Sequence, residues 1–200
     1  LAAITEANLR QDNLAGLFAH PEYHFDDSLF ERSLAYIEEN RAIAAHARTP
    51  AEAWAAFGRL SHAAQDFYSH SNYVALWLER LAPGPSPAGK STDRRGESLP
   101  PIDSIDGLDP ALLKHPRLIS ARVYWPLEAL YFIPGLGPLI KLLLPKDSHA
   151  WMNLDTPATG PLFPYSIEAA VQRTRAEFER TLAAIGEARG ESGVREFQDL

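Results

Sequence analysis

The sequence predicts an all-α domain: a bundle of helices around a metal site, with one long irregular insertion. Three observations lead to this prediction. Apolar residues recur at helical spacing along most of the chain, and no stretch alternates apolar and polar residues as a half-buried strand would. One long predicted helix carries His62, Asp66 and His70 at steps of four residues. Because the chain has no cysteine, any metal must be held by imidazole and oxygen ligands.

Composition sets limits on the class of protein. The 200 residues suit a single domain over 1–200, and 46% hydrophobic with 22% charged residues is typical of soluble globular proteins. The net charge of -7 argues against a nucleic-acid-binding surface. The chain begins at Leu1 rather than Met, which fits a shortened chain or a removed leader. A soluble domain, secreted or at a membrane surface, is expected, while the compartment and oligomeric state stay open.

Helix signals divide the first part of the chain. Residues 1–19 have apolar residues at helical spacing, and Pro21 ends this predicted helix. Ser28 with Glu31 three residues later fits a capping box, which predicts a second helix over 29–47.

Two further helices follow. Thr49 as N-cap and Pro50 in the first turn predict a helix over 50–81 without a break. A last helix is expected over 165–185. Its inward stripe is predicted to consist of Ile167, Ala170, Val171, Thr174, Phe178, Leu182 and Ile185.

The insertion over 82–144 has two parts. Residues 82–117 hold seven of the 16 prolines, which predicts a long irregular loop of the kind that forms lids or mobile insertions. Residues 118–144 are strongly apolar, but prolines, Glu128 and Lys141 interrupt them, so a membrane-spanning helix is disfavoured. This second part is either a pair of short buried helices or an exposed apolar face that meets lipid.

The spacing of His62, Asp66 and His70 favours metal binding. Each step of four residues on an α-helix turns by about 40° and rises by about 6 Å. His62 and Asp66 therefore share one face and can bind one metal, while His70 suits a second one. Imidazole with carboxylate is the ligand set of catalytic zinc. The alternative is a long helix whose polar side chains only hydrogen-bond to neighbours.

Other polar residues can complete such a site. His24 follows a proline turn in HPEYHFDD and is expected to bind metal, whereas His20 is expected to be solvated. Asp12 lies on the first predicted helix. In KDSHAWMNLD, each polar residue is as often structural as functional: Asp147, His149, Asn153 and Asp155.

The segment LSHAAQDFYSHSNYV resembles the signature of Het-C domains and the metal-binding helix of zinc-dependent phospholipases C and related single-strand nucleases. The resemblance covers roughly 1–80 and 145–185. It implies a helical bundle around up to three zinc ions and, for the Het-C branch, a link to cell death and membrane damage.

The resemblance also implies roles for particular residues. His62 and Asp66 match the helix pair, with Asp66 as the carboxylate that bridges metals, and His70 with Asn72 match the downstream His and Asn. The predicted metal ligands are Asp12, His24, His62, Asp66, His70 and His149. The family's N-terminal Trp and later His-x-x-x-Glu pair are absent, so of one to three zinc ions, one or two fit best.

The function expected from these observations is a metal-dependent phosphodiesterase that hydrolyses phospholipids. Asp66 is the predicted catalytic residue, because it would orient the attacking water. The apolar 118–144 segment would contact lipid through Tyr124, Trp125, Tyr131 and Phe132. Two alternatives stay open: a single-strand nuclease of the same fold, which the acidic charge disfavours, and a non-enzymatic membrane-perturbing module with a structural metal.

Overall fold

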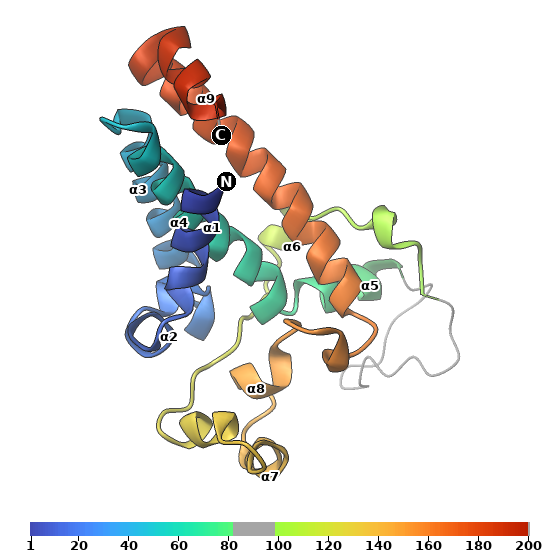
Figure 1. Cartoon of the computed structure of the whole chain (residues 1–200). Coiled ribbons are helices and arrows are strands. Elements are labelled where there is room, and N and C mark those ends of the chain that lie inside the picture. The colour runs from blue at the N-terminus through green and yellow to red at the C-terminus, as the bar shows by residue number, and fades with distance from the viewer. Residues whose placement is uncertain (82–98, 200) are drawn as a thin grey trace.

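The computed structural model describes residues 1–81 and 99–199, and these form an all-α domain (Figure 1). The predicted loop over 82–117 thus lies outside the described residues as far as residue 98. The α-helices are α1 Ala2–Leu9, α2 Leu14–Ala19, α3 Phe30–His46, α4 Pro50–His70, α5 Tyr73–Leu81, α6 Pro110–Leu113, α7 Gly137–Leu143, α8 His149–Met152 and α9 Phe163–Gln198.

Helix α4 is the centre of the bundle, with α1, α3 and α9 packed around it. It begins as predicted: Thr49 accepts from the backbone N–H of Glu52, Glu52 returns the bond, and Pro50 occupies the first turn. Such a cap stabilises a helix by about 1 kcal/mol. Gly58 lets α1 approach closely, since a Cβ there would lie 2.3 Å from the carbonyl oxygen of Ile4. This central position puts the histidines of α4 in the interior.

The N-terminal helices are shorter than predicted. The single helix expected over 1–19 breaks after α1, because the side chain of Asn13 accepts from the N–H of Gly16 and starts α2 anew. The capping box expected at Ser28 is wrong. Ser28 has a positive φ and its backbone N–H donates to Ser120, so α3 begins without a side-chain cap. The chain turns at both breaks, and polar side chains of the candidate metal centre lie next to these turns.

The helix predicted over 50–81 is also interrupted, directly after His70. Ser71 is extended, and its hydroxyl accepts from the N–H of Tyr73, where α5 starts. The side-chain amide of Asn72 stabilises the break with two hydrogen bonds: its N–H donates to the carbonyl of Arg117, and its oxygen accepts from the N–H of Ile119. Because α4 ends at this break, the side chains of its last turn can contact segments other than α5.

An extended segment over 119–123 connects three parts of the chain that are far apart in sequence. Its backbone bonds with Asn72 and His70 on one side, with Asp27 on another, and with Asp147 and His149 on a third. Within residues 1–81 and 99–199, strand-like pairing is limited to two isolated bridges, of Ser71 with Ser120 and Arg122 with Ser148. These backbone hydrogen bonds fix the positions of the three polar segments that the extended segment contacts.

The inward stripe predicted for the last helix is wrong in part. On α9, Ile167 and Val171 are 46% and 38% exposed, whereas Arg173 and Glu177 are buried. The polar pair is buried because Glu177 forms ion pairs with Arg173 and with Arg41 of α3. Helix α9 also runs past the predicted end and bends sharply at Gly190, where φ is +65°.

The apolar 118–144 segment is neither wholly buried nor wholly exposed. It forms a 3-10 helix, η5 Leu127–Phe132, and α7, which pack on each other at one end of the molecule (Figure 1). Ile140, Leu144 and Ala150 form a small core beneath them. Within the described part of the chain, no helix is long and apolar enough to cross a membrane.

Candidate metal centre

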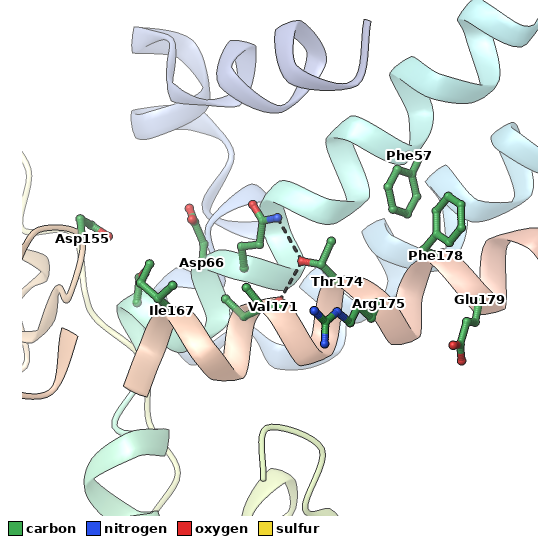
Figure 2. A pocket seen from close by; sticks show the side chains of 12 residues that line it. Phe57, Asp66, Asp155, Ile167, Val171, Thr174, Arg175, Phe178 and Glu179 are labelled. Atoms are coloured by element: carbon green, nitrogen blue, oxygen red, sulfur yellow. Dashed lines mark hydrogen bonds between the residues drawn. The ribbon is translucent and has the colours of Figure 1, made fainter. Parts of the chain in front are cut away.

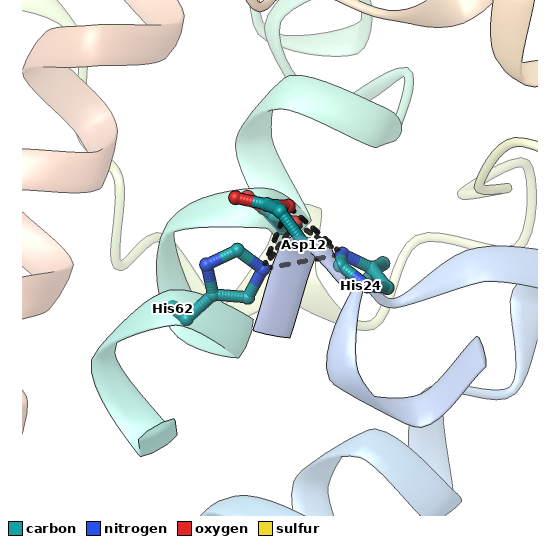
Figure 3. Close-up of side chains that lie close together, drawn as sticks. Asp12, His24 and His62 are labelled. Carbon is teal, nitrogen blue, oxygen red and sulfur yellow. Dashed lines mark hydrogen bonds and ion pairs between the residues drawn. The ribbon is translucent and has the colours of Figure 1, made fainter. Parts of the chain in front are cut away.

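The first ligand group consists of Asp12, His24, His62 and Asp66, whose ligand atoms lie within 4.8 Å of one another. Figure 3 shows Asp12, His24 and His62 converging from separate segments. Oδ2 of Asp66 lies 2.8 Å from Nδ1 of His24 and 3.1 Å from Nε2 of His62, and these two nitrogens are 3.2 Å apart. Oδ1 of Asp12 is farther, at 3.6 Å from His62 and 4.0 Å from His24.

These distances fit the ligand shell of a small cation. With zinc–nitrogen bonds of about 2.0–2.1 Å, neighbouring ligand atoms in a tetrahedron are separated by about 3.3 Å. The three tight contacts in the first group are slightly shorter than this, and those of Asp12 slightly longer. A cation at the centre would also remove the problem of two imidazole nitrogens that face each other, since only one of them can donate to the other.

The second ligand group consists of Asp26, His70 and His149. Nε2 of His70 lies 3.1 Å from Nε2 of His149 and 3.4 Å from Oδ1 of Asp155, which adjoins the group. On its other side, Nδ1 of His70 lies 3.1 Å from the carbonyl oxygen of His24 and 3.3 Å from Oδ1 of Asp26. A hydrogen bond from Nδ1 to that carbonyl would fix the ring with Nε2 toward His149 and Asp155, the arrangement typical of metal-binding histidines.

Two buried polar atoms lack hydrogen-bond partners here. They are Nε2 of His24 and Oδ1 of Asp26, and both residues are at most 2% exposed. Unpaired polar atoms in an interior are costly, and they are rare in folded proteins. The donor set and the ligand spacing fit divalent metal ions, although it is Nδ1 of His24, and not its unpaired Nε2, that faces the first group. Thus two His/Asp groups can each hold one.

The local electrostatics favour positive charge between the carboxylates. Burial raises the pKa of Asp66, but His62 and His70 outweigh burial and hold its pKa far below the usual range. Burial likewise lowers the pKa of His70, yet Asp66 and Asp26 more than compensate, so its pKa is well above the ordinary value. Burial together with the charge of His70 lowers the pKa of His149 to about 4. The raised pKa of His70 therefore favours a proton on this residue, whose positive charge lies between the carboxylates.

Each sequence candidate has a definite place. The six predicted ligands all lie in one of the two groups, with His70 and His149 in the second. Asp26, which sequence reasoning did not select as a ligand, joins the second group, and Asp155 lies beside it. Asn72 and Asp147 lie in neither: Asn72 holds the helix break, and Asp147 accepts from the hydroxyl of Tyr124.

Three features of the structure keep the ligand-bearing turns in place. Phe25 and Asp27 both have positive φ, so the turn between them presents Asp26 inward while Phe25 packs on Phe67. Glu128 is buried and accepts from the N–H of Ala150, the residue after His149. No local sequence signal marks Asp26, because a positive φ at Phe and Asp depends on the tertiary structure.

Comparisons with known proteins cover the first part of the chain. A family model described as the VWA7 N-terminal domain matches residues 1–93. Von Willebrand factor A domain-containing protein 7 of Rattus norvegicus is 35% identical over 79 residues, which are 38% of this chain and 9% of that protein. No solved structure matches.

The first 93 residues are therefore similar to the VWA7 N-terminal domain. That stretch contains the whole first group and, of the second, Asp26 and His70, but not His149. The chain spans only about a tenth of the length of the curated relative that it matches. The resemblance to Het-C domains and zinc-dependent phospholipases C remains a prediction from the sequence.

Proposed function

We propose that this domain is a metal-dependent phosphodiesterase that acts on phospholipids. The observation that supports this most strongly is a groove that receives one carboxylate of the first ligand group and one carboxylate that adjoins the second. Asp66 of the first group and Asp155 beside the second both line the same groove between α4 and α9 (Figure 2). Two adjacent divalent cations would supply Lewis-acid stabilisation for the charge that develops on a phosphodiester.

The residues would divide the work among holding, orienting and supporting. His24, His62 and His70 are buried and would hold the cations. Asp66 remains a carboxylate at neutral pH, since its pKa is far below the usual range, so it is a poor proton acceptor. Its proposed role is to bind metal and to orient the attacking water at the groove.

A surface beside the site supports a lipid substrate. We define the apolar platform as the exposed side chains of Trp125, Leu130, Ile133, Leu136, Leu139, Leu142 and Leu143. Of the four predicted lipid anchors, Trp125 is 64% exposed, Tyr124 and Tyr131 are half-buried, and the side chain of Phe132 lies outside the described part. Lys141 and Lys146 both lie over the ring of Trp151, which packs against the small core under this surface, and their positive charges suit anionic headgroups.

The test is metal content and phospholipid hydrolysis in the same preparations. Wild type, purified without chelator and supplied with zinc, is expected to carry about two ions per chain and to release phosphorylated headgroups from vesicles. Asp66→Ala should lose metal and hydrolysis together, whereas the exposed Asp103→Ala keeps both.

Three outcomes separate the alternatives. Wild type that binds no zinc refutes the metal centre. Zinc bound without hydrolysis of lipid, but with vesicle leakage, supports a structural metal in a membrane-perturbing module. Cleavage of single-stranded nucleic acid in place of lipid supports the nuclease, which the net charge of -7 disfavours.

A further inference from the structure

The groove between α4 and α9 has an apolar wall that the fold buries only in part, since Ile167 and Val171 are exposed while Phe178 packs against the core. Ile167, Val171, Thr174 and Phe178 follow one another at steps of four, three and four residues, so they lie on one face of α9. This is part of the stripe expected to face the core. Arg173 and Glu177 take the core-facing position instead, and the apolar stripe lines the groove opposite α4.

The groove has the size and shape of a small-molecule site. Its volume is about 670 Å³, within the usual range for ligand pockets. Phe57 of α4 and Phe178 of α9 lie at one end, and Asp66 and Asp155 lie toward the other (Figure 2). Gln65 of α4 donates to Thr174 of α9 at 3.0 Å, a polar bridge that connects the two helices along the groove.

The two ends of this groove call for different chemistry. At the polar end are carboxylates from the candidate metal centre, which would present cations to an anionic group. Ile167 also lies near this end, whereas Val171 and Phe178 offer hydrocarbon surface farther along the groove (Figure 2). Arg175 and Glu179, which also line the groove, carry opposite charges. A ligand that satisfies both ends has an anionic head and a hydrocarbon tail.

We propose that the groove between α4 and α9 binds one hydrocarbon chain of a phospholipid, with the phosphate at the Asp66–Asp155 end. This inference rests on the proposed function for the position of the head. The tail contacts are independent of it, because the wall of the groove contains none of the ligand histidines. Chain length therefore becomes a determinant of affinity.

The experiment measures the affinity of hexyl-, octyl- and decylphosphocholine by titration calorimetry, each below its micelle concentration, for zinc-loaded and chelated protein. Each methylene that enters the groove should strengthen binding by up to about fourfold. Val171→Asn and Ile167→Asn place an amide on the wall at positions exposed enough to tolerate it, and each should remove most of the chain-length dependence.

Ile43→Asn is the matched control, since it makes the same change on α3, where Ile43 is 42% exposed and lines neither the groove nor the apolar platform. It should keep the full dependence on chain length. Circular dichroism melts confirm that all variants fold. Affinity that is independent of chain length, or an unchanged dependence in both groove variants, overturns the proposal. A dimer without ligand that Val171→Asn dissociates also overturns it, because a second copy then fills the groove.

The two proposals fail separately. Chain-length dependence in chelated wild type supports the groove even if no phospholipid is hydrolysed, in which case only the proposed function falls. Hydrolysis by wild type without any chain-length dependence removes the groove proposal and leaves the metal centre standing.

Discussion

One carboxylate oxygen connects much of the candidate metal centre. Oδ2 of Asp66 is within 3.1 Å of nitrogens of both His24 and His62, and its charge raises the pKa of His70 in the neighbouring group. A single substitution at this position therefore acts on both groups. We therefore expect a substitution of Asp66 to reduce metal binding more than a substitution of a residue that only orients a ligand.

Asp66→Asn keeps the shape of the side chain and removes its charge. We expect zinc affinity to fall by more than about 100-fold, beyond the 10–100-fold typical of supporting residues. Competition with a zinc indicator measures this. Asp103→Asn, an exposed carboxylate distant in sequence from both groups, is the control. An Asp66→Asn protein with wild-type affinity would show that Asp66 is no ligand.

The neutral form of His149 predicts a pH dependence for the chelated protein. Its pKa is about 4 in the folded state, while the unfolded chain has an ordinary value of about 6.5. Between these values the unfolded state binds one more proton, so stability falls as the pH falls through this window. Well below about pH 6.5, His70 is protonated in both states and adds no slope.

His149→Gln removes this proton. Urea unfolding at about pH 6.5 and about pH 4.5 should show a smaller loss of unfolding free energy in the variant than in wild type. His46→Gln, at an exposed position of α3, should keep the wild-type loss. Equal losses in His149→Gln and wild type would contradict a buried neutral His149.

For individual residues, the sequence predicts part of the geometry of the candidate metal centre. A spacing of four residues is enough to bring His62 and Asp66 onto one helical face, and they lie 3.1 Å apart. The same argument cannot find Asp26 or Asp155, because their positions depend on turns that tertiary contacts fix. Residues that come together only in the tertiary structure, and not on one helix, have no regular sequence spacing that would reveal them.

Among the elements, α9 shows what periodicity misses. Its buried face contains Glu177, which is 0% exposed and forms ion pairs with Arg41, Arg173 and Arg180. The apolar stripe next to this buried face lines the groove between α4 and α9 instead of the core. A prediction from helical periodicity places the apolar residues toward the core. The structure shows a charged network there instead, because Arg41 of α3 lies where it can pair with Glu177.

Glu177→Gln should destabilise the protein by about 3–5 kcal/mol, since it leaves Arg41 and Arg173 without their buried counter-charge. Glu38→Gln is the control: Glu38 pairs with the same Arg41 but is 67% exposed, so its loss should cost at most about 1 kcal/mol. Chemical denaturation of both variants measures the difference. Equal effects would mean that burial adds nothing to this network.

Predicted helix types agree with the structure better than predicted helix ends. The expected helix over 29–47 corresponds to α3 and the capped start at Thr49 to α4. The ends at Asn13 and Ser71 are missed, because short polar side chains there form local bonds that compete with helix continuation. Both missed breaks lie next to ligand-bearing turns.

For the whole molecule, the apolar platform and the candidate metal centre share one support. Glu128 of η5 accepts from the backbone beside His149, so the segment that leads into the platform also positions a ligand. The seven exposed apolar side chains of the platform, from Trp125 to Leu143, are typical of an interaction site if they form one surface.

Leu142→Asn should weaken binding to vesicles that contain anionic lipid, by about fivefold to 50-fold if the leucine is fully buried in lipid. Ile43→Asn makes the same change on α3, at 42% exposure, and should leave binding unchanged. Vesicle sedimentation provides the measurement. Equal weakening by both variants would show that no defined face meets the bilayer.

The extended segment over 119–123 has a consequence for the order of folding. The first ligand group is complete within 66 residues, whereas the second needs contacts such as that of Ser28 with Ser120, which are 92 residues apart. Closing so long a loop is slow, because its entropy is lost before distant contacts form. If both ligand groups bind zinc, a refolding chain should therefore complete them in sequence, with a fast zinc-binding phase followed by a slower one that zinc added early cannot accelerate.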